Sequence, residues 1–142
     1  MKKISLKKLI FLFKILILIF FIDRTSKIYI LNLADNEQFL NIYINKFLNI
    51  FFIFNTGIGF GLLSFNDDLI YNITTIIIII INLIIIYFTF ASDNIKSIFF
   101  TFILGGSLGN LFDRLYYSAV PDFIDIHYGE FIPLRRLLRD VR

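Results

Sequence analysis

The sequence contains no cysteine and no tryptophan, and it has a single histidine, His127, among 142 residues. The lack of cysteine excludes disulfide frameworks, thiolate nucleophiles, iron–sulfur clusters and the usual structural zinc sites. A lone histidine gives little support to a metal centre or to a Ser/His/Asp triad. We therefore expect no metal site, so the candidate functional groups are the other polar side chains.

Charged residues are scarce, at 18% of the chain, whereas apolar residues make up 58%. Soluble domains are roughly 45 to 50% apolar, so this composition indicates a membrane protein. The net charge of +3 comes from lysine and arginine at the two ends, without a basic patch carrying stacking aromatics. This pattern favours a surface of anionic lipids over nucleic acid as a partner. At about 20 residues per span, the length allows one domain of three or four spans.

Three apolar runs predict transmembrane helices, over residues 9–28, 69–90 and about 95–112. Four lysines precede the first run and no small-x-small cleavage pattern follows it, so we predict an uncleaved span with a cytoplasmic N-terminus. In the second run, Asn72, Thr75 and Asn82 recur at offsets of three and seven. They lie near one helical face, which should point into a bundle because an amide facing lipid has no partner.

The segment 31–65 has a different texture, in which Asn, Asp and Gly punctuate short runs of Ile, Tyr and Phe. The alternation in FLNIYINKF favours a strand, so we predict a small outer β-structured segment here. With the N-terminus in the cytoplasm, three spans bring Asp23, this segment and the end of the third run to the same outer face.

Four short boxes near that face are polar: DRTSK, NTGIGFG, GGSLGNLFDR and VPDFIDI. Charges are costly in hydrocarbon, so these side chains need either partners or a chemical role. In DRTSK, Asp23 and Lys27 are spaced for an intrahelical pair, or they form an ordinary stop-transfer flank. NTGIGFG, with Asn55 and Gly57, is either a turn that admits a ligand to the backbone or merely a turn.

The two later boxes are equally open when each is taken alone. Gly105 and Gly109 form a small-x-x-x-small pair that permits close helix packing. The polar residues that follow them are interpreted as a helix-end cap and ion pair, or as functional groups: Asn110, Asp113 and Arg114. Asp122 and Asp125 could share a proton as a catalytic pair, or they could belong to a solvated acidic loop.

Taken together and in this order, the four boxes resemble the lipoprotein signal peptidases, also called signal peptidase II. The likeness runs from about Asp23 to about Ile126. It implies an aspartic endopeptidase of the bacterial inner membrane, with its active site on the outer face. Such an enzyme cuts the signal peptide of a prolipoprotein just before the diacylglyceryl-modified cysteine.

The resemblance also implies the fold and the partners. The family has four transmembrane helices and a small outer β-cradle. We therefore expect an all-α polytopic membrane protein with three recognisable spans and an extracytoplasmic β-cradle, as one domain over residues 1–142. The implied partners are prolipoproteins with a lipid-modified cysteine and membrane lipids, and we expect a monomer.

The first catalytic aspartate of the family falls on Asp122. The positions that in the family support the catalytic pair or contact the substrate match Asp23, Lys27, Asn55, Gly57, Asn110, Asp113 and Arg114. The chain departs from the family pattern at three positions, where Ile58 and Gly59 replace two alanines and Pro121 replaces a valine. Because proline removes a backbone donor, it alters the local geometry next to Asp122.

The larger departure is in the tail, HYGEFIPLRRLLRDVR. Neither the F-N-x-A-D box of the family's second catalytic aspartate nor a fourth span is found, so we expect an atypical or truncated end after about residue 131. Asp140 stands 18 positions after Asp122 and is a candidate by separation alone. The alternatives are an inactive truncated remnant of the enzyme or a small non-enzymatic membrane transport subunit.

Overall fold

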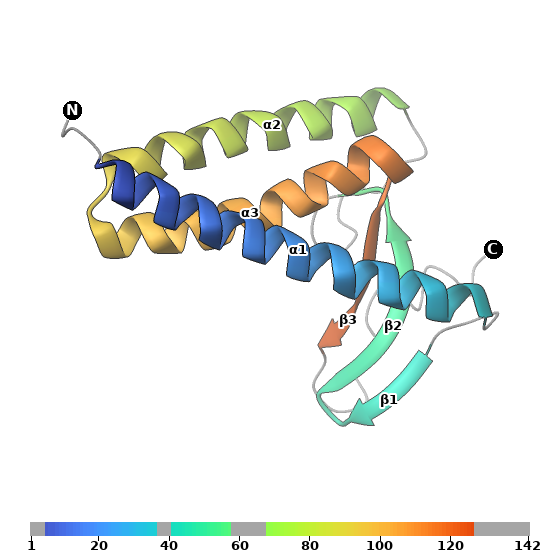
Figure 1. Cartoon of the computed structure of the whole chain (residues 1–142). Coiled ribbons are helices and arrows are strands. Elements are labelled where there is room, and N and C mark those ends of the chain that lie inside the picture. Colours follow the sequence, from blue (N-terminus) through green and yellow to red (C-terminus); the bar gives the residue numbers. More distant parts are fainter. Residues whose placement is uncertain (1–4, 37–40, 58–67, 127–142) are drawn as a thin grey trace.

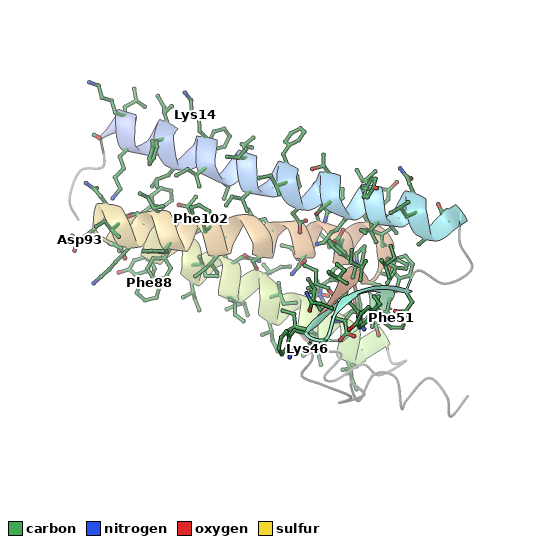
Figure 2. The ribbon with its side chains drawn as sticks, turned by 90° about the horizontal axis from the view of Figure 1, so that it is seen from below. Lys14, Lys46, Phe51, Phe88, Asp93 and Phe102 are labelled. Carbon is green, nitrogen blue, oxygen red and sulfur yellow. The ribbon has the colours of Figure 1, made fainter. Side chains whose placement is uncertain are left out.

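The computed structural model describes residues 5–36, 41–57 and 68–126 (Figure 1). Its elements in chain order are α1 (Leu6–Asn36), β1 (Asn41–Asn45), β2 (Leu48–Asn55), α2 (Asp68–Ala91), α3 (Asn94–Tyr117) and β3 (Val120–Ile126). Helix α3 packs against both α1 and α2, and the sheet lies beside the C-terminal half of α1 (Figure 1). Asp93, in the link between α2 and α3, lies at the opposite end of the bundle from Lys46 and Phe51 of the sheet (Figure 2).

The helices are apolar on the outside and partly polar on the inside. Large apolar side chains such as Phe21, Leu83 and Phe99 are exposed, whereas Asn82 and Thr101 are buried. This is the reverse of a soluble domain, in which apolar side chains fill the interior. It fits a bundle whose outer surface meets lipid and whose helices are joined by small and polar residues.

Two helices in the described ranges are long and apolar enough to cross a membrane, α2 from Leu69 and α3 over its full length. They confirm the helices predicted over 69–90 and 95–112 and are candidate spans by length and composition, although α3 continues to Tyr117. Residues 9–28 are also helical, as part of α1, but Lys14 and the charges from Asp23 to Lys27 interrupt the apolar run of this helix. A third span over 9–28 therefore stays a prediction.

The strands form one antiparallel sheet in the order β1-β2-β3, with β2 in the centre. Residues 41–55 confirm the predicted β-structured segment, and residues 58–65 lie outside the described ranges. The prediction also includes residues 31–36, which are helical instead, because α1 continues through LNLADN, a stretch that contains no glycine or proline. The VPDFIDI box is the third strand, β3, and not a loop.

The polar face predicted for α2 is only partly correct. Thr75 and Asn82 are buried, as expected, but Asn72 is exposed. Positions seven residues apart differ by about 20° around a helix, whereas positions three apart differ by about 60°. The buried stripe follows the seven-residue spacing from Thr75 through Asn82 to Thr89, and it also includes Thr74, on the side away from Asn72.

Candidate active site

Two glycines of α3 let α1 approach closely. A Cβ atom on Gly105 would lie 2.8 Å from Cγ2 of Ile19, and one on Gly109 would lie 2.7 Å from Cγ of Asp23. A larger residue at either position would press on the facing helix. The predicted role of this glycine pair is confirmed, and it places Asp23 directly against α3.

Asp113 lies between α3 and α1, with 0% of its surface exposed. Its oxygen Oδ1 lies 2.5 Å from Nη1 of Arg24, and its Oδ2 lies 2.7 Å from Nζ of Lys27. Both cations also pair with Asp23, at 2.7 Å from Arg24 and 2.9 Å from Lys27. Lys27 further donates to Oδ1 of Asn110 at 2.7 Å. These five residues are named the Asp113 cluster below.

Charge balance makes the Asp113 cluster tolerable in a membrane protein. Two carboxylates face two cations, so no net charge is buried and each acceptor has a donor. The guanidinium carbon of Arg24 also lies 4.9 Å from the ring centroid of Phe112 and 5.8 Å from that of Phe20. The predicted intrahelical pair of Asp23 and Lys27 is confirmed. Because it also contacts α3, it is more than a stop-transfer flank.

A second set of contacts, named the Asp122 chain, runs from the end of α3 to β3. Arg114 follows Asp113 and donates from Nη2 to the carbonyl oxygen of Gly57. The N–H group of Gly57 donates to Oδ1 of Asn55 at 2.9 Å, and Nδ2 of Asn55 donates to Oδ2 of Asp122 at 2.8 Å. Because the oxygen of the Asn55 amide accepts one hydrogen bond and its nitrogen donates another, the orientation of the amide is fixed. The amide in turn orients the Asp122 carboxylate.

Strand geometry separates the two carboxylates of β3. Side chains alternate along a strand, so Asp122 and Asp125, three positions apart, point to opposite faces. Asp122 lies across from Ile53 of β2, and Asp125 lies across from Asn49. The interpretation of these two as a proton-sharing pair is therefore wrong. The alternative of an acidic loop is also wrong, because both belong to a paired strand.

The two sets contain all the predicted site residues except Asp140, which lies outside the described residues. The Asp113 cluster holds Asp23, Lys27, Asn110 and Asp113, and the Asp122 chain holds Asn55, Gly57, Arg114 and Asp122. The Asp113 cluster and the Asp122 chain meet at Asp113 and Arg114, which are neighbours on α3. A shift of this helical turn would therefore move both sets of contacts. Two strands and two helices thus position one local site.

Two residues of the site are missed by the sequence reasoning, Arg24 and Tyr71. Arg24 binds both carboxylates of the Asp113 cluster, and the hydroxyl of Tyr71 donates to the carbonyl oxygen of Arg114 at 2.7 Å. The sequence does contain a signal for Arg24, which stands four residues after Phe20 and three before Lys27. These spacings place all three residues on the same face of a helix. For Tyr71 the only signal is its position in the first turn of the second apolar run.

The arrangement gives Asp122 a different environment from the other carboxylates. Asp23 and Asp113 pair with cations, and Asp122 accepts a hydrogen bond from the Asn55 amide. A half-buried carboxylate oriented by an amide is suited to acid–base work on a water or a substrate. Over the described residues, no group of three His, Asp or Glu side chains could hold a metal ion.

Comparison with known proteins assigns the family. The family model described as "Signal peptidase (SPase) II" matches residues 15–135. A lipoprotein signal peptidase of Pelagibacter ubique (strain HTCC1062) is 48% identical over 131 residues, which cover 92% of this chain and 79% of the relative. A lipoprotein signal peptidase of Wigglesworthia glossinidia brevipalpis is 40% identical over 118 residues, covering 80% and 73%.

Solved structures agree with these relatives. A bacterial membrane enzyme determined by the in meso method at 2.3 Å resolution superposes with a TM-score of 0.67 and 25% identity, over 92% of this chain and 88% of that one. A second, at 1.9 Å resolution, gives a TM-score of 0.63 and 28% identity, over 86% and 78%.

Apolar helices, an attached sheet and an oriented carboxylate, together with these matches, define a membrane aspartic peptidase. Within that class, the chain belongs to the signal peptidase II family. The resemblance seen in the four sequence boxes is thereby confirmed, and nothing in the comparisons favours a transport subunit.

Proposed function

We propose that this chain removes signal peptides from lipid-modified lipoprotein precursors, with Asp122 as one of two catalytic aspartates. The observation that carries the proposal is the hydrogen bond from Asn55 to Asp122, at 2.8 Å, which orients this carboxylate. Membership of the signal peptidase II family and the names of the relatives support the reaction.

In the proposed mechanism, Asp122 and a second aspartate hold a water molecule between them. One carboxylate takes a proton from the water while the water oxygen attacks the scissile carbonyl carbon. The partner carboxyl group then gives its proton to the leaving amine. Asp140 is our candidate for the second aspartate, and it lies outside the described residues. No metal or organic cofactor is needed for these steps.

The remaining site residues are proposed to position the catalytic aspartate or to contact the substrate. The Asp113 cluster fixes α1 against α3 at the turn that carries Arg114. Nη1 of Arg114 is buried and has no hydrogen-bond partner in the described part of the chain. A backbone carbonyl of the bound peptide would satisfy this donor, because a buried unpaired donor costs about 1–3 kcal/mol.

In this proposal, the membrane also contributes to substrate specificity. The sheet and both sets of contacts are assigned to the outer face of the bacterial inner membrane, and the N-terminus to the cytoplasm. The diacylglyceryl group on the substrate cysteine would then hold the cleavage site at the depth of Asp122. Such a proximity effect replaces much of the need for sequence recognition. We propose that the enzyme acts as a monomer in contact with lipid.

The test is cleavage of a diacylglyceryl-modified precursor by the purified chain in lipid vesicles. Asp122→Asn should abolish cleavage, because the amide cannot accept a proton. Asp125→Asn is the matched control, since it makes the same change on the opposite face of β3 and should retain activity. Equal cleavage by wild type and Asp122→Asn would overturn the assignment of Asp122.

A further inference from the structure

We infer that Tyr71, at the start of α2, is a positioning residue that holds the Asp122 carboxylate through Arg114. This inference rests on the proposed function of Asp122. Tyr71 makes two separate contacts with Arg114, one with its backbone and one with its side chain. Each contact leads to Asp122 by a different route.

The first route passes through the Arg114 side chain. The guanidinium carbon lies 5.4 Å from the ring centroid of Tyr71, within the range of a cation–π contact. The same guanidinium donates to the carbonyl oxygen of Gly57, whose N–H group orients Asn55, and Asn55 holds Asp122. The Tyr71 ring therefore sets the position of the first donor in the Asp122 chain.

The second route passes through the backbone at the end of α3. The carbonyl oxygen of Arg114 accepts the Tyr71 hydroxyl at 2.7 Å and the N–H group of Ser118 at 3.1 Å. Ser118 has a φ of 56°, a left-handed conformation that ends the helix and costs a non-glycine residue roughly 1–2 kcal/mol. The chain then enters β3 at Val120, two residues before Asp122. The Tyr71 hydroxyl therefore helps to fix where α3 ends and β3 begins.

Burial makes these contacts consequential. Arg114 is 4% exposed, so water cannot replace Tyr71 as a partner of its guanidinium. Without Tyr71, the buried guanidinium of Arg114 would shift toward another partner. The charged residue next to Arg114 in the chain is Asp113, which belongs to the Asp113 cluster. Loss of Tyr71 should thus misplace Asp122 while the rest of the bundle stays folded.

The experiment compares Tyr71→Phe and Tyr71→Leu with wild type in the vesicle cleavage assay, with kcat and KM measured separately. Tyr71→Phe keeps the ring and loses the hydroxyl, and we expect kcat to fall about threefold to tenfold, the equivalent of one hydrogen bond. Tyr71→Leu loses both contacts, and we expect a fall of about tenfold to 100-fold. Because Arg114 is also proposed to bind the peptide, KM should rise, but by a smaller factor than kcat falls, and the thermal unfolding midpoint should change little.

Two controls separate positioning from general damage. Tyr87→Phe makes the same change on an exposed tyrosine of α2, and it should retain wild-type kcat. If Tyr71 acts through Arg114, the double variant Tyr71→Leu/Arg114→Lys should be less impaired than the product of the two single losses. Losses that multiply would overturn the inference.

The outcomes also separate this inference from the proposed function. If Asp122→Asn is inactive and both Tyr71 variants keep wild-type kcat, the inference fails and the function stands. A Tyr71→Leu variant with a lowered unfolding midpoint and unchanged kcat below that temperature would likewise show a purely structural role. If Asp122→Asn remains active, the proposed function itself fails.

Discussion

Asp113 shows at the scale of single residues how a membrane protein keeps a fully buried carboxylate. Each oxygen faces one cation of α1, at 2.5 Å from Arg24 and 2.7 Å from Lys27. Burial removes water from Asp113 and Lys27 and limits its access to Arg24 and Asp23, so the ions are stable only as a set. The cluster is therefore expected to act as a single unit that joins α1 to α3.

We predict that Asp113→Asn lowers the stability of the folded chain by about 3 kcal/mol, because it leaves the buried Lys27 and the partly buried Arg24 with one carboxylate, Asp23. The measurement is the thermal unfolding midpoint of the purified chain in detergent. Asp35→Asn, an exposed change on α1, is the control and should leave the midpoint within error. An Asp113→Asn midpoint equal to that of wild type would contradict the cluster's structural role.

Most residues of the site could be predicted from the sequence, because the family resemblance assigns positions one by one. The two that were missed, Arg24 and Tyr71, act across helix contacts between residues distant in the sequence. The local pattern shows that Arg24 shares a face with Lys27, but not which carboxylate that face meets. Contacts of this kind depend on the packing of α1 and α2 on α3, which no short motif encodes.

At the scale of elements, the glycines of α3 determine how closely α1 packs. Gly105 faces Cβ and Cγ2 of Ile19, which cannot move away unless the α1 backbone moves, and Gly109 faces the carboxylate of Asp23, which Arg24 and Lys27 hold in place. Both positions are therefore closed to a larger residue. A Cβ atom on Gly106, between them, would meet no atom within 4 Å, so Gly106 is not part of this contact.

We predict that Gly109→Ala destabilises the chain by about 1–3 kcal/mol, because the new methyl group overlaps the Asp23 carboxylate. Gly106→Ala is the matched control on the same helix, and it should be neutral or stabilising by up to about 1 kcal/mol, since alanine favours helix. Unfolding midpoints of the two variants give the comparison. An equal effect of both substitutions would contradict the proposed packing of α1 on α3.

Helix α2 carries an unusual polar group within its apolar run. Asn82 is 3% exposed, and neither atom of its amide has a hydrogen-bond partner in the described ranges. We predict that Asn82→Leu raises the stability by about 1–3 kcal/mol, because it replaces an unpaired buried amide with an apolar side chain of the same branched shape. The measurement is again the unfolding midpoint. A lower midpoint would show that the amide is bonded in the membrane.

The elements differ in how well the sequence predicts them. The bounds of α2 agree closely with its prediction, because an uninterrupted apolar run has a clear start and end. The sequence places the end of α3 too early, since Asp113 and Arg114 look like the start of a loop until their partners on other elements are known. Strand β3 is missed because its partner, β2, is distant in the sequence and pairing of this kind leaves little local pattern.

At the scale of the whole molecule, the Asp113 cluster and the Asp122 chain lie at the end of the bundle that carries the sheet, which Figure 1 shows beside the C-terminal half of α1. Near the other end, Nζ of Lys8 donates to the carbonyl oxygen of Ser92 at 3.2 Å, which ties α1 to the link after α2. The apolar length of α2 and α3 lies between these ends. This division predicts an enzyme that is anchored by its helices and performs its chemistry at one membrane surface.

The central claim is that this chain cuts lipoprotein precursors at the lipid-modified cysteine. The most direct measurement is mass spectrometry of the products after incubation of a diacylglyceryl-modified precursor with the chain in lipid vesicles. We predict release of a signal peptide that ends immediately before the modified cysteine, and no release from a precursor without the lipid. A precursor that remains intact beside the folded chain, or is cut elsewhere, would contradict the account.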